Sequence, residues 1–196
     1  MADAAPAHGV VVLAAGASRR LGQAKQLLRI DGETLVHRAA RLALSTQPAA
    51  AVLVVGADAD SVGAAASDLP LRRVDCIDWQ RGMGASLHAG LAALPAECAG
   101  ALVVLCDQPA LDTDHLAALV AAWRADPDAA SASSYAGRAG VPALLPRCWF
   151  DDLRRDADDH GARALLARRR DAVTLIVNEA LALDIDTPAQ FAPFAQ

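Results

Sequence analysis

Residues 10–28 read VVVLAAGASRRLGQAKQLL, a short apolar run that passes directly into a loop of small residues and cations. Runs that are rich in β-branched residues and lack an alternation of apolar and polar residues are typical of strands buried on both faces of a sheet. The same kind of run returns at residues 51–56 (AVLVVG) and 101–106 (ALVVLC). The three runs predict parallel strands, and the first strand ends in a loop suited to an anion.

Segments of helical periodicity lie between these runs and after them, at residues 33–44, 59–69, 83–94, 115–125 and 150–170, with a break near 158–161. Small residues and glycines over 128–146 predict a strand and a hairpin, and residues 172–177 predict a last strand. Alternation of strand and helix is typical of parallel βαβ units. We therefore predict an α/β fold of three layers, Rossmann-like, with a mostly parallel central sheet and helices on both faces.

The length of 196 residues fits a single domain over 1–196, in which we expect residues 1–8 to form a flexible N-terminus. No apolar run reaches about 18 residues, and the start lacks a basic region followed by an apolar one. We therefore expect a cytoplasmic protein without a membrane partner. A net charge of −5 argues against a nucleic-acid partner, because such proteins need a broad basic face.

Four cysteines form no CxxC pair and lie mostly beside apolar residues, as reduced core thiols do: Cys76, Cys98, Cys106 and Cys148. The small residues 14–18 let backbone N–H groups approach a phosphate. The spacing of Gly16 and Gly22 does not match a Walker loop, and residues 82–87 (GMGASL) lack the third glycine of a dinucleotide-binding GxGxxG. The first departure argues against an ATPase, and the second argues against a nicotinamide-dependent oxidoreductase.

Four cations stand beside the small-residue loop in an acidic protein, as a triphosphate ligand requires: Arg19, Arg20, Lys25 and Arg29. For Arg20 and Arg29 a solvated surface turn explains the charge as well. Lys25 differs, because it is the single lysine beside seventeen arginines. Lysine is a compact point charge on a flexible stem, so we expect this chain to keep it for a specific contact.

Asp107 ends the third apolar run, where ligands of open parallel sheets bind. A magnesium ligand fits this place better than a helix cap, since Asp112 is nearer to the next helix. In residues 181–191 (LALDIDTPAQF), Asp186 is either a second ligand or the residue before a helix capped by Thr187. We assign Asp184 a structural role.

Residues 13–28, LAAGASRRLGQAKQLL, resemble the signature LAAGxSxRMGxxKxLL of the molybdenum cofactor cytidylyltransferases, nucleotidyltransferases of the molybdopterin guanylyltransferase-like superfamily. The resemblance runs from about residue 9 to residue 191 and implies the nucleotidyltransferase form of the fold. It implies that the nucleotide is wrapped by Leu13, Ala14, Ala15, Gly16, Ala17 and Ser18. It further implies that Arg19 and Lys25 hold the phosphates, and it favours Asp107 and Asp186 as ligands of Mg²⁺.

Residues 82–91 (GMGASLHAGL) resemble a family segment that helps to read the base, which makes Gly84 and Ser86 candidate nucleotide contacts. Arg163 is a candidate partner of an acceptor phosphate. It belongs to one of two segments that resemble acceptor-facing segments of the family, residues 137–145 (GRAGVPALL) and 158–166 (DDHGARALL).

These features imply that an acceptor phosphate attacks the α-phosphorus of CTP and that pyrophosphate leaves. The catalytic residues are then Lys25, Arg19 and Asp107. The resemblance implies a molybdopterin-type acceptor, and a molybdoenzyme that receives the product is a further partner. Two alternatives stay open: transfer to another phosphate, such as a sugar or methylerythritol phosphate, and a non-catalytic carrier of the pterin cofactor.

Overall fold

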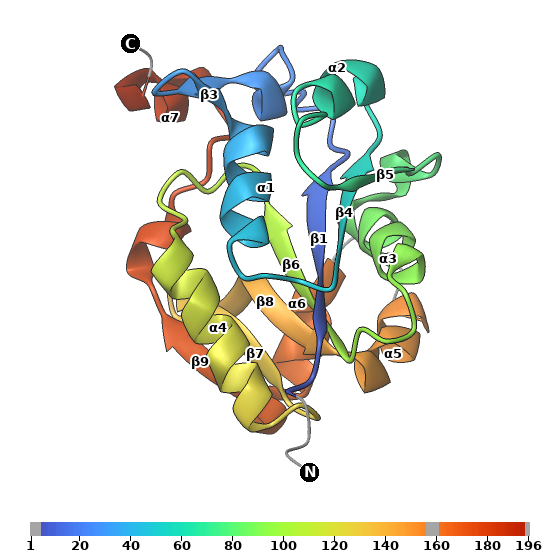
Figure 1. The fold of residues 1–196 in the computed structure, drawn as a ribbon. Coiled ribbons are helices and arrows are strands. Elements are labelled where there is room, and N and C mark those ends of the chain that lie inside the picture. The colour runs from blue at the N-terminus through green and yellow to red at the C-terminus, as the bar shows by residue number, and fades with distance from the viewer. Residues whose placement is uncertain (1–4, 156–160, 195–196) are drawn as a thin grey trace.

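The computed structural model describes residues 5–155 and 161–194, and its centre is a sheet of seven strands (Figure 1). Across the sheet the order is β5-β4-β1-β6-β8-β7-β9. Neighbouring strands are parallel except that β8 runs antiparallel to β6 and β7. The bounds are β1 His8–Ala14, β4 Ala50–Val55, β5 Arg72–Asp75, β6 Gly100–Leu105, β7 Ala130–Tyr135, β8 Arg138–Pro146 and β9 Val173–Val177.

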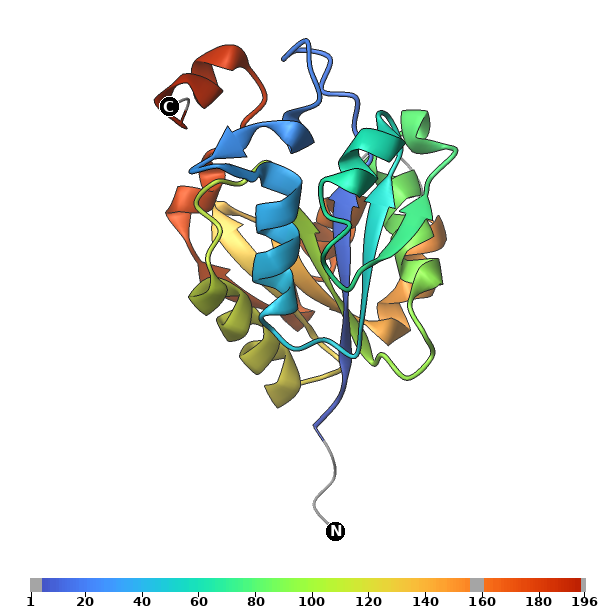
Figure 2. The same cartoon turned by 45° about the horizontal axis from the view of Figure 1, so that its top comes forward.

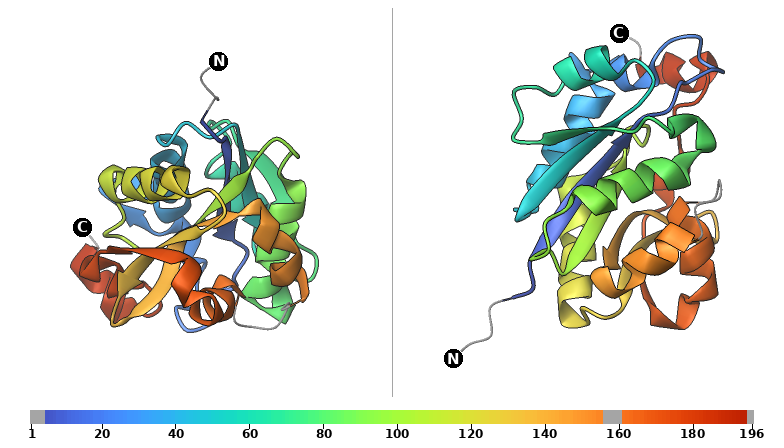
Figure 3. Two further views of the ribbon diagram at one scale, coloured as in Figure 1. Left: turned by 90° about the horizontal axis from the view of Figure 1, so that it is seen from below. Right: turned by 90° about the vertical axis from the view of Figure 1, so that its right-hand side faces the viewer.

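Helices cover both faces of this sheet, as the two views of Figure 3 show. One buried apolar cluster joins the sheet to α1 (Leu35–Leu44), α2 (Ala59–Ala64) and α4 (Thr113–Ala125). A second cluster joins the opposite face to α3 (Met83–Ala93), α5 (Phe150–Arg155) and α6 (Gly161–Arg168). The predicted α/β fold with a mostly parallel sheet and three layers is confirmed.

The three apolar runs form the central strands β1, β4 and β6, as the sequence predicts. The sequence did not predict β5, because that strand lies at the edge of the sheet and most of its side chains are exposed, Arg72, Arg73 and Asp75 among them. The break expected near 158–161 lies largely outside the described residues. Among the residues described, no helix combines the length and the apolar character needed to cross a bilayer.

Two expectations about single residues are wrong. His8 does not belong to a flexible N-terminus, since it is the first residue of β1 and is 1% exposed. Its Nε2 atom lies 2.9 Å from Oγ1 of Thr46. Cys148 is exposed, whereas Cys76, Cys98 and Cys106 are buried free thiols as expected.

The C-terminal segment returns to the loop that follows β1. A small apolar cluster joins Leu21 and Leu28 of that loop to Leu35 and Ile185. The backbone N–H of Ile185 also donates to the carbonyl oxygen of Asp107 at 2.9 Å. Figure 2 shows the result, with α7 (Pro188–Phe191) beside the short hairpin of β2 (Arg29–Ile30) and β3 (Glu33–Thr34). This docking brings the end of the chain to the carboxyl ends of the central strands.

Candidate active site

A cavity of about 350 Å³ opens at the carboxyl ends of β1 and β6, and its size suits a small ligand. Residues 13–18, predicted to wrap a nucleotide, all line it. Four more predicted site residues share its wall: Arg19, Lys25, Ser86 and Asp107. Gly84 does not, because it is buried inside the first turn of α3, and Gly82 lines the cavity instead.

The loop after β1 is held in shape by Gln26, which is 2% exposed. Its Nε2 atom donates to the carbonyl oxygens of Ala14 at 3.0 Å and Gly16 at 2.7 Å. Ser18 has a left-handed backbone with φ of 50°, and its hydroxyl accepts from the backbone N–H of Lys25 at 3.0 Å. A Cβ atom on Gly16 would meet nothing within 4 Å, so this glycine leaves open space for a ligand.

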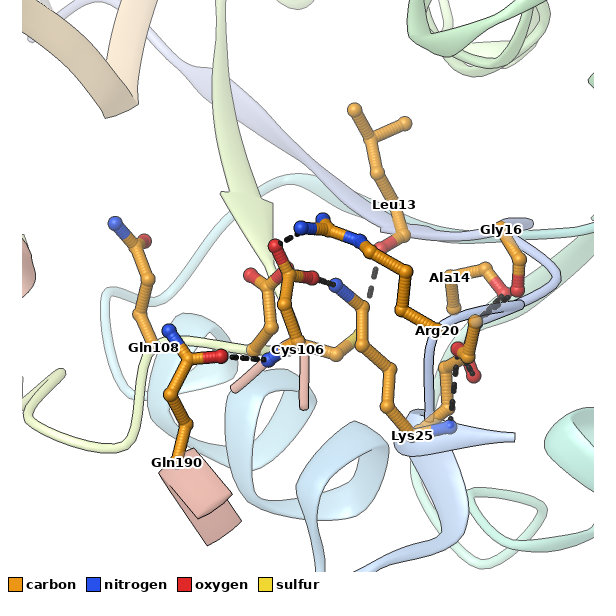
Figure 4. A network of polar contacts seen from close by, with 12 residues as sticks. Leu13, Ala14, Gly16, Arg20, Lys25, Cys106, Gln108 and Gln190 are labelled. Atoms are coloured by element: carbon orange, nitrogen blue, oxygen red, sulfur yellow. Dashed lines mark hydrogen bonds and ion pairs between the residues drawn. The ribbon is translucent and has the colours of Figure 1, made fainter. Parts of the chain in front are cut away.

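Lys25 does not project into solvent, since its side chain is 18% exposed. Figure 4 shows its ammonium between two carboxylates. The Nζ atom donates to Oδ2 of Asp107 and, at 2.8 Å, to Oδ1 of Asp186. Arg20, whose side chain is 72% exposed, donates to the other Asp186 oxygen at 2.6 Å, so this solvated cation is also ion-paired. The specific contact expected of the single lysine therefore joins two aspartates from distant parts of the sequence.

These contacts shift the pKa values of the charged groups in the site. Burial alone would lower the pKa of Lys25, but the Asp107 and Asp186 carboxylates outweigh burial and raise that pKa. Burial would raise the pKa of Asp186, yet Lys25 and Arg20 lower it below its ordinary value. Asp184 has no such partner, and burial followed by the nearby Asp107 and Asp186 charges raises its pKa to about 6. Asp186 is thus held ionised at neutral pH, whereas Asp184 is the harder of the two to ionise.

The Asp107 and Asp186 pair fits a hard divalent cation. The Oδ1 atom of Asp107 is buried without a hydrogen-bond partner among the described residues, and the other oxygen shares one cation with Asp186. No group of three or more His, Cys, Asp or Glu side chains in the described part of the chain is arranged to hold a metal. Two carboxylates suffice for Mg²⁺, because phosphate oxygens and water complete its octahedron.

The carboxylate of Asp186 is not part of the cap of α7. The hydroxyl of Thr187 accepts from the backbone N–H of Gln190 at 3.4 Å, and Gln190 Oε1 accepts from the backbone N–H of Asp186 at 3.1 Å. The cap therefore uses the main chain of Asp186 and leaves its side chain to Lys25 and Arg20. Of the two roles that the sequence left open for Asp186, the place before a capped helix is observed, and it leaves the carboxylate available for a metal ion.

Trp79 forms a wall of the cavity that the sequence did not reveal. A Cβ atom on Gly56 would lie 2.7 Å from Trp79 and 2.8 Å from the carbonyl oxygen of Ala15. Glycine at 56 is thus required for the indole to pack beside the loop. Ser86, on the same side, is 5% exposed and lies 3.8 Å from the Cys76 sulfur. A tryptophan three positions before the GMG segment is the sequence signal that could have indicated this wall.

A second cavity of about 290 Å³ adjoins the first, and Met83 and Leu105 line both. Arg138 of β8 and Arg163 of α6 line it, so the two segments that resemble acceptor-facing ones come together here. Asp184, to which the sequence analysis assigned a structural role, also lines this cavity.

The sequence profile of the MobA-like NTP transferase domain matches residues 10–173. A protein named Nicotine blue oxidoreductase from Paenarthrobacter nicotinovorans is 36% identical over 191 residues, 92% of each chain. Purine catabolism protein PucB of Bacillus subtilis is 34% identical over 195 residues, again 92% of each chain. Among solved structures, Rv0371c from Mycobacterium tuberculosis superposes with a TM-score of 0.86 at 29% identity, covering 98% of both chains. Another structure of Rv0371c, a complex with manganese, gives a TM-score of 0.79 at 26% identity, covering 96% of this chain and 97% of that one.

Proposed function

Because the chain belongs to the family of MobA-like NTP transferase domains, we propose that it transfers CMP from CTP to a phosphate-bearing acceptor of the molybdopterin type and releases pyrophosphate. One observation carries this proposal. The small-residue loop lines a cavity beside which Asp107 and Asp186 converge on one cation. A triphosphate on the loop would thus lie beside both carboxylates.

In this reaction an oxygen of the acceptor phosphate forms a bond to the α-phosphorus of CTP. The bond from that phosphorus to the bridging oxygen breaks, and pyrophosphate leaves with the electron pair. Residues 14–18 position the triphosphate through their backbone, and Arg19 and Lys25 neutralise its charge. Asp107 and Asp186 would hold Mg²⁺, which supplies charge neutralisation at the phosphate oxygens.

Several observations support the finer parts of the proposal. The second cavity opens beside the first and offers an acceptor a place next to the nucleotide. A structure of the similar protein Rv0371c is a complex with manganese, which supports a divalent cation in this family. Ala15 lines the cavity, and its methyl group takes up room that a glycine would leave, which a pyrimidine tolerates better than a larger purine. The expected product is the cytosine dinucleotide of the molybdopterin-type acceptor. The expected partner is a molybdoenzyme that receives this product.

A second candidate function is redox chemistry, because the 36% identical relative is named Nicotine blue oxidoreductase. The proposal of nucleotidyl transfer is favoured by the loop after β1, which has one glycine in residues 14–19 and is flanked by cations that suit a triphosphate. The two functions make opposite predictions about the cosubstrate. A transferase consumes CTP and releases pyrophosphate, whereas an oxidoreductase exchanges electrons with a redox cosubstrate such as a nicotinamide.

The deciding experiment combines CTP, Mg²⁺ and a panel of phosphate acceptors with detection of pyrophosphate. We expect pyrophosphate release that requires a molybdopterin-type acceptor and disappears in Asp107→Asn. The matched control is Asp171→Asn, since the Asp171 side chain is 99% exposed. Pyrophosphate release with only a sugar phosphate or methylerythritol phosphate would change the acceptor that we assign. Binding of the pterin compound without pyrophosphate release would indicate a carrier. Consumption of NADH or NADPH without pyrophosphate release would favour the oxidoreductase.

A further inference from the structure

The second cavity contains a carboxylate, that of Asp184, which takes no part in the contacts of the first cavity. Asp184 is half-buried in its wall, and among residues 5–155 and 161–194 it forms no hydrogen bond or ion pair. Its neighbour Asp186 is bound by Lys25 and Arg20, so the two aspartates differ in their partners. Because this side chain is partly exposed, water can hydrate its carboxylate, and a ligand that displaces that water must supply hydrogen-bond donors in its place.

The two arginines of this cavity are also unpaired. Within the described part of the chain, neither Arg138 nor Arg163 forms an ion pair or a hydrogen bond, although many other arginines do. Both are exposed. The wall of the cavity therefore carries one carboxylate that accepts hydrogen bonds and two guanidinium groups that donate them, and the charge of Arg138 acts on Asp184. A complementary ligand carries N–H or O–H donors for the carboxylate and anionic or carbonyl oxygens for the arginines.

The remaining wall distinguishes between two kinds of ligand. Leu105, Met83 and Val141 supply apolar surface. The Tyr135 hydroxyl is already engaged, because it donates to the Val141 carbonyl oxygen at 2.8 Å and lies 3.4 Å from the Gln108 amide nitrogen that donates to it. A polyol needs a polar partner for most of its hydroxyl groups. A flat heterocycle needs partners only along its edges and suits apolar walls.

We propose that Asp184 selects the acceptor, by accepting hydrogen bonds from the donor edge of a flat nitrogen heterocycle in which a ring N–H adjoins an exocyclic amino group. Arg138 and Arg163 bind the oxygen-bearing groups of the same molecule. The inference rests on the proposed function in so far as that molecule is the phosphate acceptor. It assigns Asp184 to substrate recognition and separates it from Asp107 and Asp186.

The test measures binding by calorimetry to the full-length protein, with a pterin that carries a phosphate monoester as the probe and erythritol phosphate as the polyol. We expect the wild type to bind the pterin phosphate more tightly than the polyol phosphate. Asp184→Ala should weaken pterin binding by about 10- to 100-fold, because two donors lose their partner, and Asp184→Asn should weaken it less, since an amide still accepts one bond. Polyol binding should change by less than about twofold.

Asp171→Asn is the matched control and should bind both probes as the wild type does, and thermal melting checks that each variant is folded. CTP affinity and the Mn²⁺ dependence of CTP binding should be unchanged in the Asp184 variants. Equal pterin affinity in wild type and Asp184→Ala would overturn the proposal, as would tighter binding of the polyol phosphate or a shifted Mn²⁺ dependence. Pterin selectivity without pyrophosphate release would refute the transfer reaction and leave the role of Asp184 standing.

Discussion

The Nζ atom of Lys25 lies 2.8 Å from Oδ1 of Asp186, 161 positions later in the chain. The same ammonium donates to Asp107, whose side chain is only 13% exposed. One cation thus holds together the carboxylates of two distant segments. The single lysine of the chain is a structural link of the site as well as a candidate phosphate ligand.

Lys25→Ala is expected to lower kcat/KM for pyrophosphate release by about 100-fold or more, since a preorganised charge at the triphosphate is lost. It should also lower the free energy of unfolding by about 1 to 3 kcal/mol, because Asp107 and Asp186 lose their shared partner. Lys25→Arg should recover only part of the activity, as a planar guanidinium cannot reproduce a point charge between two carboxylates. Wild-type kcat/KM in the arginine variant would contradict this explanation.

Asp107→Asn is expected to reduce pyrophosphate release by about 100-fold at millimolar Mg²⁺, because the amide lacks the charge of a hard-cation ligand. Asp186→Asn should act in the same direction and raise the Mg²⁺ concentration for half-maximal rate. Asp184→Asn should leave the Mg²⁺ dependence unchanged. Magnesium titrations of the three variants provide the measurement, and equal shifts at Asp184 and Asp186 would argue against a metal site built from Asp107 and Asp186.

Gln26→Leu is expected to raise the KM for CTP by about 10-fold or more, because the Ala14 and Gly16 carbonyl oxygens lose the donor that shapes the loop. Steady-state kinetics with varied CTP at saturating acceptor measure this effect. Gln23→Leu is the matched control, since Gln23 is an exposed residue of the same loop. If both leucine variants had the same KM, the role assigned to Gln26 would be wrong.

CTP should be preferred over GTP and ATP by at least about tenfold in kcat/KM, the scale of steric discrimination at a pocket wall. The physical reason is that the side chains of Ala15 and Trp79 both line the cavity, so an alanine in place of glycine at 15 leaves less room for a purine. Competition among the three nucleotides at equal concentration, with saturating acceptor, gives the ratio directly. Preferred incorporation of GMP would replace the cytidylyl assignment and leave nucleotidyl transfer intact.

His8 should make the protein less stable in acid. Burial, followed by the charge of Arg124, lowers the pKa of His8 from 6.5 to about 4. Between these values the unfolded chain binds the proton and the folded chain does not, so stability is full above pH 6.5 and falls as the pH drops toward 4. His8 accounts for a decrease in the free energy of unfolding of the order of 2 to 3 kcal/mol. Urea unfolding at pH 7 and pH 4 should show a smaller drop for His8→Gln than for wild type, and parallel drops would refute this role.

The sequence by itself determined the three central strands, because apolar β-branched runs of strand length have few other stable places than a buried sheet. It also indicated the phosphate loop and Asp107, since small residues after a first strand and an aspartate at a strand end are local signals. Asp186 was favoured as a metal ligand by the family resemblance alone. The strand β5 carried no such signal, because an edge strand is stabilised by pairing with β4 and its charged side chains remain in water.

Only the tertiary structure decided how the site is assembled. Asp186 reaches Lys25 because Ile185 packs on Leu21, Leu28 and Leu35 and its N–H bonds to Asp107, contacts between segments far apart in the chain. Gln26 and Asp184 illustrate this limit. Gln26 is buried and donates to the carbonyl oxygens of Ala14 and Gly16, whereas Asp184 is half-buried and has no hydrogen-bond or ion-pair partner among the described residues. Whether a polar side chain supports the fold or awaits a ligand depends on which donors the folded chain brings within hydrogen-bond distance, and local sequence does not contain that information.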